Sequence, residues 1–316
     1  MNNQTVYWLW IQQALGYGSV NISYIIENYT FAEDFYRASF REKLMCGSFS
    51  HNLAEKLRDT SLDNAGKTIE MCIKSGIEII TVGDLYYPER LLHISNPPVV
   101  LFVKGNAEVL SAEKNLAMVG TRSATPYGTR NAFRLAFDLA KNDYTIVSGG
   151  ALGIDTSSHR GTLQADGSTV CVLGCGINYS YLPQNAPMRN QILRKGAVIS
   201  EYAPDVHPSK VTFPLRNRII SGLSKGVLVV EAGRRSGSLI TVELAMEQGR
   251  DVFAVPGDIS SSVSVGTNDL IKDGAFPVTS ADDIVQYYGA QVKSEIPKIK
   301  KQGIISLPTL SPKPSM

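Results

Sequence analysis

The chain has 316 residues, of which 43% are hydrophobic and 19% charged, and its 31 basic and 29 acidic residues leave a formal net charge of +2. This composition is typical of a globular protein, and the length allows two domains or one large α/β domain with an appendage. Because the total charge is close to zero, it indicates neither a nucleic-acid nor a membrane partner, and any electrostatic argument has to be local.

The cysteines and the N-terminus predict a cytoplasmic protein. Cys46, Cys72, Cys171 and Cys175 form no C-x-x-C pair and have no histidine at metal-ligand spacing, so we expect reduced thiols and no structural zinc. We also expect no cofactor. The opening MNNQTVYWLWIQQALGYG has a short apolar face and no basic leader. We therefore expect neither a signal peptide nor a membrane span.

Residues 1 to about 80 predict a small helical domain. Helical spacing of apolar residues occurs in VYWLWIQQAL and again in NLAEKLRDTSLDNAGKTIEMCIKSG, and strand-like runs are few. The segment SNPPVVLFVKGN, at 95–106, then changes from a double proline to a β-branched run and a glycine turn. It predicts a strand that leads into a second, different domain at 81–290.

From residue 115 onward, short apolar runs alternate with helical segments, which is typical of a parallel sheet with crossover helices. The strand candidates are 116–121, 144–150, 169–176, 197–202, 226–233 and 251–257. Five of them carry glycine near their carboxyl ends, which share one edge of such a sheet, where ligands of open α/β sheets bind. After Asp258 we expect a polar loop and two short helices joined by a possible strand. Residues 291–316, rich in Lys, Pro and Ser, predict a flexible tail.

Two loops at this edge have the character of phosphate-binding turns. In VGTRSATPYG, Gly120 permits close backbone approach, the following helix start offers free amides, and Arg122 could contact a phosphate beside them. A solvated loop arginine would explain Arg122 equally well if this loop stood alone. In SGGALGIDTSSHRGTL, Gly149 and Gly150 suit a tight phosphate-binding loop, whereas His159 is better explained as a hydrogen-bonded structural histidine than as a general base.

A third loop, LGCGINYSYLPQN, carries no charge. It could line a cleft for a base or sugar, and a packed turn explains it equally well.

Basic residues concentrate in one part of this near-neutral chain. The segment between Val206 and Ser238 contains six basic residues and one acidic residue, Glu231, which gives it a net charge of +5. The six basic residues are Lys210, Arg216, Arg218, Lys225, Arg234 and Arg235. Several phosphates along a strand match such a patch better than one small anion, and Phe213 offers a ring on which a base could stack. Salt-bridged structural arginines and a core phenylalanine remain the alternative.

These motifs, in this order, resemble those of the DprA (Smf, DNA-processing protein A) family. The resemblance rests on VGTRSATPYG, SGGALGIDTSSHRGTL, LGCGINYSYLPQN, ISEY, FPLRNRIISGLSKGVLVVEA, RSGSLITVELAMEQGRDVFAVPGD and GTNDLIKDGA, and covers roughly residues 80 to 276. It implies an α/β fold: an extended Rossmann-like, mostly parallel sheet with helices on both faces, preceded by a helical domain related to sterile-alpha or helix-hairpin-helix modules.

The resemblance also implies a function without a catalytic step. The protein would bind single-stranded DNA in a basic pocket, protect it, and load the RecA recombinase during natural transformation, as a homodimer with no membrane partner. The DNA-binding residues that it implies are Gly120, Arg122, Ser148, Gly149, Gly150, Lys210, Phe213, Arg216, Asn217, Arg218, Arg235, Ser236, Gly237 and Ser238.

Two departures from the family pattern bear on these expectations. Leu152 stands where members usually carry Arg or Lys, so one backbone contact would be missing. Because the sequence ends in a Lys/Pro-rich segment, we expect no winged-helix domain of the kind that many members have. An alternative function is a nucleotide-processing enzyme of the phosphoribohydrolase type, with Glu231 and Glu243 as its acids.

Overall fold

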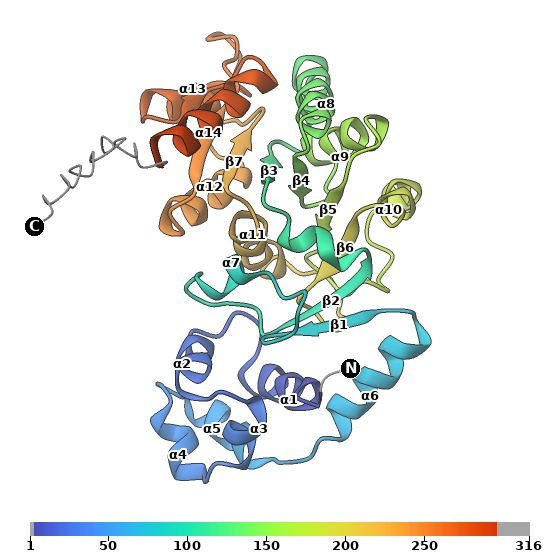
Figure 1. The fold of residues 1–316 in the computed structure, drawn as a ribbon, viewed down its shortest axis with the longest axis vertical. Coiled ribbons are helices and arrows are strands. Elements are labelled where there is room, and N and C mark those ends of the chain that lie inside the picture. Colours follow the sequence, from blue (N-terminus) through green and yellow to red (C-terminus); the bar gives the residue numbers. More distant parts are fainter. Residues whose placement is uncertain (1–2, 296–316) are drawn as a thin grey trace, which may run out of the picture.

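The computed structural model describes residues 3–295, with side chains described as far as residue 290 (Figure 1). Its elements alternate along the chain much as the apolar periodicity predicts. The helices are α1 (Thr5–Leu15), α2 (Asn21–Asn28), α3 (Ala32–Arg37), α4 (Phe40–Met45), α5 (His51–Arg58), α6 (Asp63–Lys74), α7 (Glu89–Leu92), α8 (Pro126–Lys141), α9 (Ile154–Gln164), α10 (Ala186–Ile192), α11 (Thr212–Gly222), α12 (Ser238–Glu247), α13 (Val265–Lys272) and α14 (Ala281–Glu295), with short 3-10 turns at Ala107–Ser111 and Pro183–Asn185.

A single nine-stranded sheet organises the chain, in the order β1-β2-β6-β5-β4-β3-β7-β8-β9. The strands are β1 (Glu78–Thr81), β2 (Val100–Gly105), β3 (Asn115–Val119), β4 (Thr145–Ser148), β5 (Thr169–Val172), β6 (Ala197–Ser200), β7 (Gly226–Val229), β8 (Asp251–Ala254) and β9 (Phe276–Pro277). Strands β3 to β9 pair in parallel, and only the β1–β2 and β2–β6 pairs are antiparallel. All six predicted parallel strands and the strand leading into them are confirmed, whereas β1 was not predicted.

Both faces of the sheet are buried, because helices cover each of them. In β3, Leu116 and Met118 pack with α8 and α14, while Ala117 and Val119 point to the opposite face and pack with α11 and α12. Successive side chains of a strand alternate between faces, so a strand covered on both sides reads as a continuous apolar run. The predicted Rossmann-like class is therefore confirmed.

Helices α1 to α6 do not form an isolated core. Their buried side chains, such as Trp10 and Phe35, share one cluster with residues of β1 and β2, among them Ile79 and Phe102. A boundary at residue 80 would divide β1, and the division of the chain into domains stays a prediction.

The C-terminal segment is described only in part. Helix α14 continues to Glu295, five residues into the segment predicted as a tail, and residues 296–316 lie outside the described part of the chain. Within residues 3–295, no helix is both long and apolar enough to cross a membrane.

Candidate nucleic-acid interface

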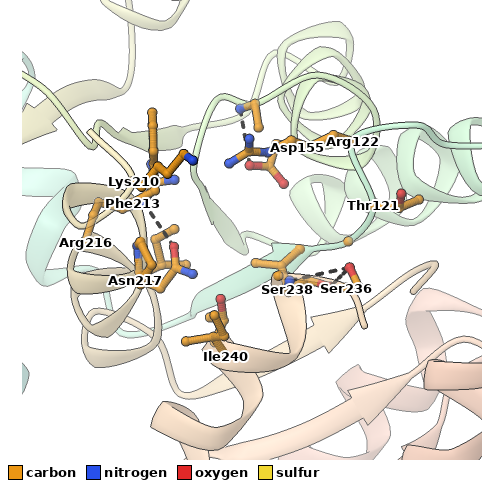
Figure 2. A pocket seen from close by; sticks show the side chains of 17 residues that line it. Thr121, Arg122, Asp155, Lys210, Phe213, Arg216, Asn217, Ser236, Ser238 and Ile240 are labelled. Atoms are coloured by element: carbon orange, nitrogen blue, oxygen red, sulfur yellow. Dashed lines mark hydrogen bonds between the residues drawn. The ribbon is translucent and has the colours of Figure 1, made fainter. Parts of the chain in front are cut away.

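A cavity of about 580 Å³ lies at the carboxyl ends of β3, β4 and β7 (Figure 2). From β3 the chain passes through α8 to β4 on one side, and from β7 through α12 to β8 on the other side. The strand order therefore reverses between β3 and β7, and open α/β sheets bind their ligands at such a crevice.

The cavity brings together most of the residues that the sequence singled out. Its lining includes Gly120, Arg122, Lys210, Phe213, Arg216, Asn217, Ser236, Gly237 and Ser238. These residues come from the loop after β3, the start of α11 and the start of α12. Segments that are more than a hundred residues apart in the chain thus meet at one site.

Five predicted residues do not line it, namely Ser148, Gly149, Gly150, Arg218 and Arg235. Ser148 is fully buried and donates its hydroxyl hydrogen to the Met118 carbonyl at 2.7 Å, which ties β4 to β3. Arg235 is exposed just before the part of the R-S-G-S loop that does line the cavity.

Two cations and an aromatic ring line the cavity together. The guanidinium carbon of Arg122 lies 5.4 Å from the centre of the Phe213 ring, and Lys210 lines the same cavity (Figure 2). Within residues 3–295, neither cation has a hydrogen bond or an ion pair, and both side chains are exposed. Their charges are therefore available to a ligand.

The Phe213 ring is held from behind. It is half-buried, Tyr181 packs against it with ring centres 5.3 Å apart, and its edge abuts the backbone after β5. A Cβ atom at Gly174 would lie 2.6 Å from Cδ1 of Phe213, so that only glycine leaves room for the ring. A ring fixed in this way loses little freedom on stacking with a planar ligand.

Arg216 lines the cavity but uses much of its donor capacity within the protein. Its Nη1 donates to the carbonyl of Gly149 at 2.9 Å and to the carbonyl of Val172, and its Nε donates to Oδ1 of Asn217 at 3.2 Å. Burial lowers the pKa of Arg216, and the nearby charge of Asp155 opposes that fall. Arg216 thus braces the loops after β4 and β5.

Asp155 is the carboxylate opposite Arg216. Its Oδ2 accepts a hydrogen bond from the Ala151 amide at 3.2 Å, and burial raises its pKa while Arg216 opposes the rise. A Cβ atom at Gly149 would lie 2.7 Å from Nη2 of Arg216 and 2.8 Å from Oδ2 of Asp155. Gly149 therefore acts behind the cavity wall, because any side chain there would push this pair apart.

Arg218 points away from the cavity. Its Nη2 donates to both carboxylate oxygens of Glu201, at 2.6 and 2.7 Å, and each of the two side chains is only 2% exposed. Oε1 of Glu201 also accepts a hydrogen bond from the Gly18 amide at 3.4 Å. Arg218 therefore joins α11 to the region where the N-terminal helices meet the sheet.

The start of α12 lies at the cavity, whereas the start of α8 is capped outside its lining. Thr125 caps α8, and Glu231 at the end of β7 accepts hydrogen bonds from the Thr125 amide at 2.8 Å and from its hydroxyl at 2.5 Å. At α12, the Ser236 and Ser238 hydroxyls bond each other at 2.8 Å within the R-S-G-S loop. The Ser238 amide donates to the Ser236 hydroxyl at 3.5 Å and the Leu239 amide to the Ser236 carbonyl at 3.0 Å, and the positive end of the α12 dipole opens onto the cavity, where it favours an anion.

The carboxylates considered for the enzyme alternative do not meet in the cavity. Glu231 holds the start of α8, and Glu243 is exposed on α12 outside the lining. Among the described lining residues, Asp155 is the only carboxylate.

His159 and the cysteines lie in the interior. Nδ1 of His159 is 2.7 Å from Oγ1 of Thr169, and burial lowers the pKa of the imidazole to about 3. The interpretation of His159 as a structural histidine is confirmed. All four cysteines are free and buried, and within residues 3–295 no group of His, Cys, Asp and Glu side chains could hold a metal ion.

Sequence reasoning missed several lining residues, including Thr121, Asp155, Ile240 and Thr241. Thr121 lies between two residues that were named, and Ile240 and Thr241 follow the R-S-G-S loop by less than one helical turn. By residue type alone Asp155 would suit a helix cap, but α9 begins at Ile154 and Gly153 is its N-cap. Only its side-chain direction, which the sequence does not carry, identifies it as part of the cavity.

A comparison with protein families matches the sheet-forming part of the chain to one of them. The family profile described as DNA recombination-mediator protein A matches residues 78–289. The chain belongs to this family. The match contains every residue that lines the cavity.

Curated relatives from this family agree with the assignment. The chain is 41% identical over 213 residues to "DNA processing protein DprA" of Bacillus subtilis, covering 67% of this chain and 72% of that protein. It is 46% identical over 199 residues to the protein of the same name from Streptococcus pneumoniae, covering 63% of this chain and 70% of that protein.

Solved structures extend the similarity beyond the sheet. The crystal structure of DNA processing protein A from Streptococcus pneumoniae aligns with a TM-score of 0.78 at 35% identity and covers 90% of this chain and 98% of that one. A Helicobacter pylori structure, whose title concerns the single-stranded DNA binding mode of DNA processing protein A, aligns with a TM-score of 0.62 at 30% identity and covers 69% of this chain and 98% of that one. Members of the DNA processing protein A family thus share this architecture.

Proposed function

We propose that this protein binds single-stranded DNA in the cavity at the carboxyl ends of β3, β4 and β7. The observation that carries the proposal is the pair Arg122 and Lys210, two exposed cations that have no hydrogen bond or ion pair within residues 3–295 and that line the cavity with the braced ring of Phe213. Cations that neutralise phosphates and an aromatic ring that stacks with a base are the combination used by single-strand binders. The positive end of the α12 dipole, which opens onto the cavity, would also favour a phosphate there.

The proposed role in the cell follows the family resemblance. The protein would act by binding and not by catalysis, protect incoming single strands in the cytoplasm, and load the RecA recombinase in natural transformation as a homodimer. The similarity to the DNA processing proteins of Bacillus subtilis and Streptococcus pneumoniae supports this role. Incubation with nucleoside monophosphates should release no free base, and a released base would favour the phosphoribohydrolase alternative.

Fluorescence anisotropy with a labelled oligo(dT) tests the binding site. Replacing both Arg122 and Lys210 by alanine should weaken binding and flatten the slope of log affinity against log salt by about 2, because each lost phosphate contact removes about 1. The matched control replaces Lys141 and Arg194 by alanine, since both are exposed and lie at helix ends that return to the amino edge of the sheet. Equal binding by the cavity variant and the unmodified protein would refute the site.

A further inference from the structure

A second hollow that fits a ligand lies among the N-terminal helices. It has a volume of about 590 Å³ and is formed by α3, α4, α5 and the turn after α5. Figure 1 shows these helices at the opposite end of the molecule from α8 and α13. The hollow shares no residue with the cavity at the sheet edge.

Its lining combines positive charge with aromatic rings. Arg37, Lys43 and Arg58 contribute three cations, Tyr36 and Phe40 contribute two rings, and no described lining residue is acidic. The guanidinium carbon of Arg58 lies 4.3 Å from the centre of the Phe40 ring. Acidic neighbours do exist, but Glu33 and Glu55, which pair with the two arginines, lie outside the lining.

Lys43 is the residue that marks this hollow as a binding site. It is only 3% exposed, and its Nζ lies 4.9 Å from the Trp10 ring centre and 5.5 Å from that of Tyr36. Within residues 3–295 its ammonium group has no hydrogen bond and no ion pair, and burial lowers its pKa. Rings compensate only part of the cost of desolvating a charge, so a buried ammonium without an anionic partner is expensive to maintain.

A phosphate oxygen would remove this cost, and the rings indicate what carries the phosphate. Cations alone would be enough to bind a flexible acidic peptide. A nucleotide offers both a phosphate for the cations and a planar base for the rings within one repeat of the strand. Tyr36 is held in place by its hydroxyl, which donates to the Thr60 carbonyl at 2.8 Å, and by the edge of Trp10, with ring centres 5.1 Å apart. Its ring is therefore a fixed surface beside the buried charge.

We propose that the hollow lined by Tyr36, Arg37, Phe40, Lys43 and Arg58 is a second contact site for single-stranded DNA, with Lys43 binding a backbone phosphate. The choice of a DNA strand as ligand rests on the proposed function, but the site is separate from the cavity at the sheet edge. A strand that reaches both sites would gain affinity through effective concentration, whereas a strand too short to reach both would not.

The test measures binding in the Arg122→Ala/Lys210→Ala background, so that the first cavity contributes as little as possible. Anisotropy is recorded at low salt with labelled oligo(dT) of about 6 and about 30 nucleotides, the first within and the second beyond the range of about 4–16 nucleotides that one single-strand site occupies. Two further substitutions are added separately, Lys43→Met, which retains an unbranched apolar stem against Trp10, and Arg58→Ala, which removes an exposed cation at little risk to folding. Lys56→Met is the matched control, since Lys56 is an exposed lysine on α5, the helix of Arg58, and does not line the hollow.

The background protein should retain binding to the longer oligonucleotide. Lys43→Met should weaken that binding roughly tenfold, as expected for a lost charged hydrogen bond, Arg58→Ala should weaken it less, and Lys56→Met should leave it unchanged. The proposal is overturned if the background binds no long oligonucleotide, if neither Lys43→Met nor Arg58→Ala alters its binding, or if Lys56→Met weakens it equally. It is also overturned if an acidic peptide binds at the hollow and the oligonucleotide does not.

Failure of the proposed function has a different signature. It would appear as equal binding of the 6-nucleotide probe by the unmodified protein and the Arg122→Ala/Lys210→Ala variant. A loss of the second site alone leaves that comparison intact and affects only the longer probe. Circular dichroism melting curves confirm that each variant is folded at the temperature of the assay.

Discussion

Glu201→Gln should destabilise the protein severely without altering its DNA site. Glutamine keeps the shape of the side chain but removes the negative charge that faces Arg218. Both side chains are 2% exposed, and Nη2 of Arg218 donates to both carboxylate oxygens at 2.6 and 2.7 Å. Among the described residues, Nε and Nη1 of Arg218 have no hydrogen-bond partner, so the carboxylate is the main compensation for the buried guanidinium.

The size of the effect follows from this burial. Removing one partner of a buried pair leaves an uncompensated charge and lowers the free energy of unfolding by about 3–5 kcal/mol. For a domain of 150–250 residues this corresponds to a fall of roughly 6–20 °C in the melting temperature. A variant that replaces Glu201 by Gln and Arg218 by Met together should recover most of the loss, because it buries no charge.

Thermal melting followed by circular dichroism measures the loss, and anisotropy with oligo(dT) measures the site. Asp166→Asn is the control, because it breaks the exposed pair of Asp166 with Lys195 and should hardly change the melting temperature. Affinity for DNA below the melting transition should stay unchanged in the Glu201 variants. An unaltered melting temperature for Glu201→Gln, or a loss of DNA affinity at full stability, would refute this reasoning.

Three further predictions concern single residues around the cavity. Phe213→Ala should weaken oligo(dT) binding by about 1–3 kcal/mol through lost stacking, whereas Phe213→Trp should retain most of the affinity in the same anisotropy assay. His159 has a pKa of about 3 in the folded protein, whereas in the unfolded chain it binds a proton below about pH 6.5. The free energy of unfolding should therefore be highest above that pH and fall as the pH is lowered towards 3. Chemical denaturation at several pH values should show a smaller fall for His159→Asn. Gly149→Ala should lower the free energy of unfolding by about 1–3 kcal/mol and weaken DNA binding, because the added methyl group enters the space between Arg216 and Asp155. An unchanged free energy of unfolding together with an unchanged DNA affinity would show that the loop can move to make room.

Local sequence patterns were sufficient for the elements of the sheet. Continuous apolar runs such as 226–229 became buried strands, since a strand covered by helices on both faces has no polar side. Strand β1 was missed because its four residues, EIIT, directly follow a helical pattern and pair antiparallel with β2. Nothing local to those residues distinguishes that pairing from the end of a helix.

Glycines were located correctly at the sheet edge, but their roles needed coordinates. Gly149 and Gly150 were expected to approach a phosphate. Gly149 instead leaves space for Arg216 and Asp155, and Gly150, at a φ of 66°, has the Cys171 sulfur behind it. A glycine in the sequence indicates a close approach, but the partners of that approach come from other elements of the fold, here α9, α11 and β5.

The sequence by itself determined that cations would gather at the carboxyl edge of a Rossmann-like sheet, because strand ends and basic residues are properties of short segments. Only the tertiary structure decided what each cation does. Arg216 and Arg218 are two residues apart, so α11 directs them to different faces. One meets the carbonyls of Gly149 and Val172 at the cavity wall, and the other meets the carboxylate of Glu201 in the interior. Their identical side chains differ in role because folding places different partners opposite each face of the helix.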